Sequence, residues 1–326
     1  MQEQEMAEKN LILKFLAGSH AYGTNTSDSD KDYLGVFIPD EEYVIGNKVC
    51  EQVEIRTNKS GSGKKNTKED TDTVIYSLPK FLKLLRDNNP TILETLYFQK
   101  KNVVFCNSMG QRLIDARGMF PSKQVKSKFL GYALSQRKHL THKKERWEAL
   151  GTALRQLDDW EREGFKTLPD SLNLPSALRE DKTWGFYQNG QEIGYVRDII
   201  IGEITSYGHR VYDIQTYGFS TKFASHTIRL LSEGLTFLVE GDLKFPLPNN
   251  NLIRDIKMGK YPLEAILAMA TAQEKLVEEA YVNSKLPVAA DAKAIDRFQM
   301  EMLKDFWGYS KQKTWLQKFL GQFSKQ

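Results

Sequence analysis

Residues 18–39 read GSHAYGTNTSDSDKDYLGVFIP, and this polar stretch separates two short apolar segments. The first segment, Asn10–Ala17, is typical of a buried strand, and the second, Asp32–Ile38, predicts another. The stretch between them opens with a Gly-Ser pair and ends in two acids spaced two apart, Asp30 and Asp32. The order of strand, Gly-Ser turn, loop, acid pair and strand decides how the whole chain is interpreted.

The two acids and the turn suit a metal ion and a phosphate. Residues two apart on a strand face the same side, so both carboxylates can converge on one point. Mg²⁺ prefers carboxylates combined with substrate phosphates. Gly18 allows close backbone approach, while free N–H groups and the Ser19 hydroxyl can hold a phosphate. An acid pair in a polar loop is more often a solvated turn, and only its combination with the Gly-Ser turn favours a site.

The following residues predict more strands and a helix. Val49–Ile55 alternates apolar and polar residues, as a half-buried strand does, and Thr71–Tyr76 predicts another strand. Between them, Arg56–Asp70 contains no apolar residue and predicts a loop. Ser77 and Pro79 then mark the start of a helix. The first third of the chain is therefore expected to be α+β.

Beyond about residue 120 the apolar spacing becomes mainly helical. Helical patterns cover Val125–Leu150, Phe223–Glu240 and Pro262–Tyr281, whereas Phe165–Tyr217 is irregular in pattern. We therefore expect an α+β catalytic domain over residues 1–119. A mostly helical domain over residues 120–326 would follow, with an irregular insertion around 165–217.

Composition narrows the class of protein. The 326 residues are 40% hydrophobic and 27% charged with a net charge of +4, which excludes a disordered or histone-like chain. No apolar run reaches the roughly 18 residues of a membrane helix. Two cysteines, Cys50 and Cys106, are too few for a disulfide framework. These features predict a cytoplasmic protein with no membrane partner and no disulfide-linked partner.

The acid-pair motif resembles the signature of the DNA polymerase β-like nucleotidyltransferase superfamily. The exact residues of the motif are most similar to those of the YcgL/RlaP-type branch, several members of which are associated with RNA ligases. Other segments are similar to that branch: DTVIYSLPKFL from Asp72, NNPTILETL containing Glu94, KFASHTIRLL from Lys222, and KLP at 285–287. The resemblance implies a polymerase-β-like mixed sheet with flanking helices, followed by a mostly helical domain.

The same resemblance implies a mechanism and its ligands. Asp30 and Asp32 would bind two metal ions, Mg²⁺ or Mn²⁺, and Asp72 would supply a third carboxylate and could accept the proton of the attacking hydroxyl. Asp70 competes with Asp72 for this role, but the VIY segment after Asp72 favours Asp72. Gly18 and Ser19 would bind the substrate, a nucleoside triphosphate.

Two groups of basic residues are further candidates. Lys222, His226 and Arg229 share one helix face, and we expect them to line the same cleft as the acids and contact the triphosphate. The alternative is a solvated stripe. Residues 124–147 are also strongly basic; Lys138, Lys143 and Lys144 are our candidates for binding nucleic acid, against the alternative of a solvated helix face.

The sequence thus favours a metal-dependent nucleotidyltransferase. It would move a nucleoside monophosphate from an NTP to an acceptor hydroxyl on RNA, such as a tRNA or a broken RNA end, and release pyrophosphate. Two alternatives remain open: a protein-modifying, AMPylating-type transferase, and a non-catalytic RNA-binding or regulatory protein on the same fold. The intact acid pair argues against the last, because a binding protein does not need two converging carboxylates.

Overall fold

The computed structural model describes residues 2–26, 29–57, 71–168, 190–206 and 210–309. Its centre is a mixed five-stranded sheet in the order β3-β4-β2-β1-β5. The strands are β1 (Leu11–Leu16), β2 (Lys31–Phe37), β3 (Gln52–Arg56), β4 (Thr71–Ser77) and β5 (Val103–Cys106). β2 and β4 are parallel, and the other neighbouring pairs are antiparallel. The predicted α+β class and mixed sheet are confirmed, and four of the strands lie where the sequence predicted them.

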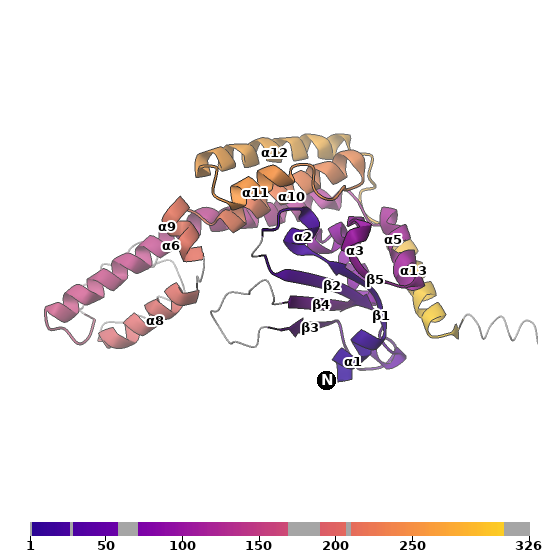
Figure 1. Cartoon of the computed structure of the whole chain (residues 1–326), viewed down its shortest axis with the longest axis horizontal. Helices are drawn as coiled ribbons and strands as arrows, with labels where there is room; N and C mark the ends of the chain where they lie inside the picture. Colours follow the sequence, from indigo (N-terminus) through magenta and orange to yellow (C-terminus); the bar gives the residue numbers. More distant parts are fainter. Residues whose placement is uncertain (1, 27–28, 58–70, 169–189, 207–209, 310–326) are drawn as a thin grey trace, which may run out of the picture.

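Helices surround this sheet and make up most of the chain. The α-helices are α1 (Gln2–Lys9), α2 (Gly18–Tyr22), α3 (Leu78–Arg86), α4 (Pro90–Leu93), α5 (Ser108–Asp115), α6 (Gly131–Arg162), α8 (Ile193–Ser206), α9 (Arg210–Tyr217), α10 (Thr221–Glu240), α11 (Asn250–Lys257), α12 (Leu263–Asn283) and α13 (Ala292–Phe306). The 3₁₀ turn η2 (Glu94–Tyr97) and the π-helical turn η5 (Lys126–Leu130) precede β5 and α6, respectively. Figure 1 shows α10, α11 and α12 stacked above α2 and the sheet.

Local sequence explains the start of α3. The Ser77 hydroxyl accepts a hydrogen bond from the Lys80 amide at 3.4 Å, and Pro79 lies in the first helical turn. These are the capping hydroxyl and early proline that mark a helix start. Four residues of α3 are buried in the same core as the apolar residues of the sheet: Leu78, Phe81, Leu82 and Leu85. The predicted helix is confirmed.

One expectation about secondary structure is corrected, and one element was not predicted. The unpredicted element is α1, at the polar N-terminus, which buries Met6 and Ala7 beside Phe37. The segment 165–217, expected to be irregular, contains the helices α8 and α9. In α8 the exposed side carries Tyr195 and Ile201 as well as Asp198, so the apolar residues of this helix do not mark a single face. Residues 169–189 and 207–209 lie outside the described residues.

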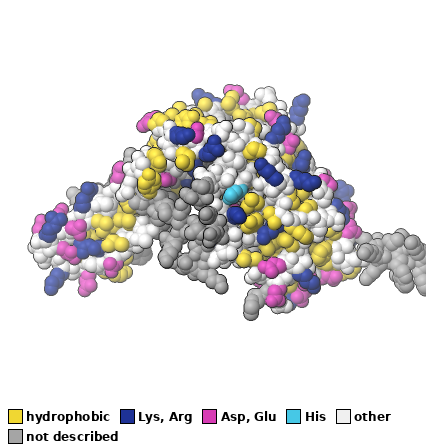
Figure 2. All heavy atoms as spheres, viewed as in Figure 1, with side chains coloured by type: hydrophobic (Ala, Val, Ile, Leu, Met, Phe, Trp, Pro, Cys, Tyr) yellow, Lys and Arg dark blue, Asp and Glu magenta, His cyan; other side chains and the backbone are white. Residues whose placement is uncertain are grey.

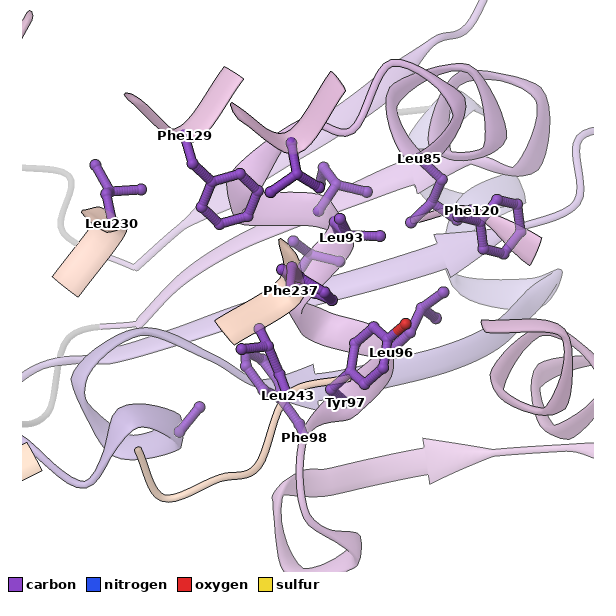
Figure 3. Close-up of a cluster of buried hydrophobic side chains, with 14 of the residues drawn as sticks. Leu85, Leu93, Leu96, Tyr97, Phe98, Phe120, Phe129, Leu230, Phe237 and Leu243 are labelled. Carbon is purple, nitrogen blue, oxygen red and sulfur yellow. The ribbon is translucent and has the colours of Figure 1, made fainter. Parts of the chain in front are cut away.

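One large core joins the sheet to the helices above it. Figure 3 draws Leu85, Leu93 and Leu96 in one buried cluster with Phe129 and Phe237, which come from later helices. Residues before and after position 119 therefore share this core, while the division of the chain at 119 stays a prediction. A second, smaller cluster joins α6 to α8 in the arm at the left of Figure 1.

Two expected absences can be compared with the described residues. Among them, no helix is long and apolar enough to cross a membrane. Cys50 and Cys106 are both free thiols, so they do not form a disulfide with each other.

Candidate active site

The two strands that run parallel bring two predicted acids together. Asp32 on β2 is the register partner of Asp72 on β4. Neighbouring strands lie about 4.8 Å apart, and register partners in a parallel pair project to the same face of the sheet. Asp30 lies just before β2 and lines the same pocket as the other two acids. The third carboxylate is thus placed beside the acid pair by strand pairing between segments 40 residues apart in sequence.

Gly18 holds the Gly-Ser turn tightly against Asp32. It has a φ of +60°, and a Cβ atom there would lie 2.3 Å from the Asp32 Oδ2. The neighbouring Ala17 amide also donates a hydrogen bond to the Asp32 carbonyl at 2.8 Å. Only glycine adopts this conformation without a clash. The turn expected to bind phosphate therefore touches a carboxylate expected to bind metal.

The carboxylates form a crowded negative site. Burial raises the pKa of the Asp32 carboxyl, and the charges of Asp30 and Asp72 raise it further, while Lys222 and His20 act in the opposite direction. Such a site is stabilised by a proton or a cation. Among the residues that the structure describes, no three His, Cys, Asp or Glu side chains are already arranged to hold a metal ion. The three acids would therefore have to turn toward a common point; as a set of oxygen donors they fit Mg²⁺ or Mn²⁺.

A pocket of about 360 Å³ contains all eight residues expected to act in catalysis or NTP binding. They are Gly18, Ser19, Asp30, Asp32, Asp72, Lys222, His226 and Arg229. The last three lie on α10, which crosses above the sheet in Figure 1. Figure 2 shows a histidine near the middle of this face with Lys and Arg side chains around it. The α10 residues lie in the same pocket as the acids, as expected. The roles of these α10 residues remain predictions.

Comparison with known proteins agrees with this geometry. Residues 1–169 match RlaP, described as the RNA repair pathway DNA polymerase beta family. The chain belongs to the RlaP family. One similar protein is an uncharacterised 38.9 kDa protein from the nrdC-mobD intergenic region of Enterobacteria phage T4. The two sequences are 27% identical over 329 residues, and the match covers 91% of this chain and 94% of the phage protein.

A solved structure was also found, a nucleotidyltransferase-like protein from Exiguobacterium sibiricum. It is 10% identical, with a TM-score of 0.25, and the match covers 87% of this chain and 75% of that one. The resemblance to RlaP-type proteins stated from the motifs is confirmed by the family match. The chain is thus a member of a DNA polymerase beta family that is described by an RNA repair pathway.

In this RlaP family member, His226 is neutral. Burial lowers its pKa to about 3, and the nearby charges of Arg229, Lys222 and Lys257 contribute to the shift. At neutral pH the imidazole can therefore donate or accept a hydrogen bond but brings no positive charge to the pocket. Lys222, Arg229 and Lys257 are positively charged groups of the pocket lining, and Lys257 at the end of α11 was not singled out from the sequence.

Arg229 is already contacted by carboxylates of this chain. Its Nη1 lies 2.7 Å from the Glu94 Oε2 and 2.9 Å from the Glu233 Oε1. The guanidinium is 4.2 Å from the centre of the Tyr22 ring. Two carboxylates already face this buried cation, which also lines the pocket, so its expected contact with the triphosphate stays a prediction. Glu94 lies in the NNPTILETL motif, which was the one sequence signal for this partner.

The two carboxylates beside Arg229 share one cation. Burial raises the pKa of Glu94, although Arg229 opposes this, and burial raises the pKa of Glu233 strongly, with the neighbouring Glu94 adding to the effect. A proton retained on Glu233 leaves Arg229 and Glu94 as a neutral pair. Removing one partner of a buried pair commonly costs about 3–5 kcal/mol.

The basic segment before residue 147 is partly neutralised by distant acids. Arg137 contacts Glu274 of α12 at 2.7 Å, and Arg146 forms an ion pair with Glu203 of α8. These partners lie outside the segment in sequence, so its unpaired positive charge is smaller than its own residues suggest. Lys138, Lys143 and Lys144 belong to α6, but their side chains lie outside what the structure describes. Their predicted contact with nucleic acid is untested.

Proposed function

We propose that this chain is a divalent-metal-dependent nucleotidyltransferase that moves a nucleoside monophosphate from an NTP to a hydroxyl group on RNA. The observation that carries the proposal is the register pairing of Asp32 with Asp72, beside Asp30, in the pocket that also holds the Gly18-Ser19 turn. Three carboxylates next to a close-approach turn provide donors for metal ions and N–H groups for phosphate.

Each residue has a defined task in the proposed reaction. The acceptor oxygen forms a bond to the α-phosphorus as the bond to the β-phosphate oxygen breaks, and pyrophosphate leaves. Asp72 accepts the hydroxyl proton. Gly18 and Ser19 hold the phosphates, and Lys222 offsets their charge. Bound by the acids, Mg²⁺ or Mn²⁺ supplies charge stabilisation and lowers the pKa of the attacking hydroxyl.

The choice of RNA as acceptor rests on two supports. The family is defined by an RNA repair pathway. In addition, Lys138, Lys143 and Lys144 lie along α6, the helix whose early residue Tyr132 lines the pocket. A basic helix leading away from a pocket suits a phosphate backbone. As specific substrates we favour a tRNA or a broken RNA end as the acceptor and ATP as the nucleotide donor.

The test is transfer of radioactive phosphate. The chain is incubated with each α-³²P-labelled NTP, Mg²⁺ or Mn²⁺, and total RNA, with a protein-only control. We expect labelled RNA, and we expect Asp30→Asn and Asp32→Asn each to lower the rate by about 10²–10³ or more. Asp115→Asn is the matched control, since Asp115 lies outside the pocket and receives a hydrogen bond from Gln111. Equal activity of wild type and Asp32→Asn would refute the site.

A second measurement tests the acceptor. Changing Lys138, Lys143 and Lys144 together to Ala should weaken RNA binding and reduce the slope of log affinity against log salt by roughly one unit for each lost phosphate contact. An unchanged slope would show that the three lysines only face solvent. Label that enters protein and not RNA would instead support the protein-modifying alternative.

A further inference from the structure

Four side chains from three separate elements form a buried polar cluster, and three of them, Tyr22, Glu94 and Arg229, also line the pocket. The Tyr22 hydroxyl, at the end of α2, donates to the Glu94 Oε1 of η2 at 2.5 Å. Arg229 of α10 contacts the other oxygen of Glu94 at 2.7 Å and both oxygens of Glu233 at 2.9 and 3.0 Å. The cluster therefore joins α2 to α10 through one carboxylate.

This cluster is shielded from solvent. Glu94 and Glu233 are each 1% exposed, Arg229 is 5% exposed and Tyr22 is 9% exposed. The Arg229 guanidinium also stacks over the Tyr22 ring. Charge-assisted hydrogen bonds between groups with so little exposed surface are strong and directional.

Helix α2 depends on such an anchor. It has five residues, too few to be stable alone, because a helix this short has hardly passed its nucleation step. Its first residue, Gly18, touches the Asp32 carboxylate, and its last residue, Tyr22, belongs to the cluster. At 1.5 Å per residue the two ends are only about 6 Å apart. A shift at Tyr22 is therefore transmitted to Gly18 and Ser19.

The other side of the cluster is α10, which also carries Lys222 and His226 into the pocket. Arg229 lies one turn beyond His226 on the same helix. The cluster thus connects the turn on one wall of the pocket to the basic helix on the opposite wall.

We infer that Tyr22, Glu94, Arg229 and Glu233 form a positioning anchor that sets the Gly18-Ser19 turn at a fixed place relative to Asp32 and to the Lys222–His226 wall. This inference concerns how the four residues hold the turn, and it is separate from the triphosphate contact expected of Arg229. Their proposed effect on NTP binding rests on the proposed function, whereas their effect on the order of α2 does not.

The first experiment measures the order of α2 directly. Hydrogen exchange of the Gly23 and Thr24 amides, which both donate to the Ser19 carbonyl, reports whether the helix is closed. Tyr22→Phe removes one hydroxyl and keeps the ring, and we expect exchange of these amides to become at least tenfold faster. Tyr97→Phe is the matched control: Tyr97 is also buried, and its hydroxyl donates to the Arg117 carbonyl outside the pocket.

The second experiment measures catalysis. In NMP transfer by the full chain, Tyr22→Phe should raise the KM for NTP at least tenfold with a smaller change in kcat, and Tyr97→Phe should change neither by more than twofold. Arg229→Lys should fall between wild type and Tyr22→Phe, because it retains the charge and loses the planar guanidinium.

The outcomes separate the two proposals. Faster exchange at Gly23 and Thr24 in an enzyme that transfers no nucleotide would retain the anchor and refute the function. Exchange in Tyr22→Phe equal to that in Tyr97→Phe would refute the anchor, whatever the wild-type activity. A KM for NTP that is unchanged in an active Tyr22→Phe enzyme would likewise refute its positioning role.

Discussion

The neutral state of His226 makes the stability of this protein depend on pH in a calculable way. The folded protein keeps the imidazole uncharged down to about pH 3, because of burial and the positive charges of Arg229, Lys222 and Lys257. In the unfolded chain the same group takes up a proton below about pH 6.5. Its contribution is therefore present in full above pH 6.5 and is lost as the pH falls toward 3.

The size of the effect follows from the two pKa values. Each unit of pH between them costs about 1.4 kcal/mol, so lowering the pH from 7 to 4.5 should remove about 2.5 kcal/mol that depends on His226 alone. Urea unfolding of wild type and His226→Gln at both pH values measures this. All other titrating groups are common to both proteins, so the stability difference between them isolates the imidazole.

We expect wild type to lose about 2.5 kcal/mol more than His226→Gln over this range. Equal losses would show that the imidazole protonates as easily in the fold as in the unfolded chain, which would refute its burial against the positive wall. An NMR titration that found a pKa near 6.5 for His226 in the folded protein would refute it independently.

Three further predictions concern the pocket. Gly18→Ala should destabilise the fold by about 2 kcal/mol from the left-handed backbone and the clash with Asp32 and abolish transfer, whereas Gly151→Ala, where a Cβ meets nothing within 4 Å, should be neutral or stabilising in urea unfolding. Asp32→Asn should raise Tm at pH 7 without divalent cations, because the raised pKa makes ionised Asp32 costly in the fold, and this gain should vanish near pH 3. Tyr132→Ala should weaken RNA binding about tenfold by loss of base stacking, with Leu134→Ala, equally exposed but outside the pocket, unchanged in the same titration.

Local sequence patterns predicted the strands well, because their signals are local. The buried run of β1 and the alternation of β3 each reflect which side of the chain faces the core. The Ser77 cap and Pro79 similarly fix the start of α3 within a few residues. Asp72 was chosen from the sequence because a strand follows it, and its pairing with Asp32 agrees with that choice; its competitor Asp70 lies outside the described residues.

Partners that come from distant segments were not predictable in this way. Helical spacing correctly placed Arg229 on one face with Lys222 and His226, but spacing says nothing about depth or about which group lies opposite. Glu94 is 135 residues away in sequence and supplies a carboxylate that contacts Arg229. The same limitation affected the basic segment, where Glu274 and Glu203 pair with arginines of α6 from helices later in the chain.

The balance of charge in the pocket gives a prediction about metal removal. Its described lining contains four carboxylates, Asp30, Asp32, Asp72 and Glu94, and three cations, Lys222, Arg229 and Lys257. With Glu94 and Arg229 paired to each other, three acids still face two lysines, and a triphosphate adds more negative charge. Repulsion between two unit charges at roughly 6 Å costs about 3 kcal/mol at an effective dielectric constant of 20, or roughly 100-fold in affinity.

Wild type should therefore bind ATP about 100-fold more weakly in EDTA than in Mg²⁺, as measured by calorimetry. The double variant Asp32→Asn/Asp72→Asn lacks two of the repelling charges. In EDTA it should therefore bind ATP more tightly than wild type does, and Mg²⁺ should increase its affinity for ATP only slightly. Equal wild-type affinity with and without Mg²⁺ would contradict a metal role for the acids. A double variant that bound ATP no better than wild type in EDTA would show that repulsion by these carboxylates does not control entry, and that the requirement for metal lies elsewhere in the pocket.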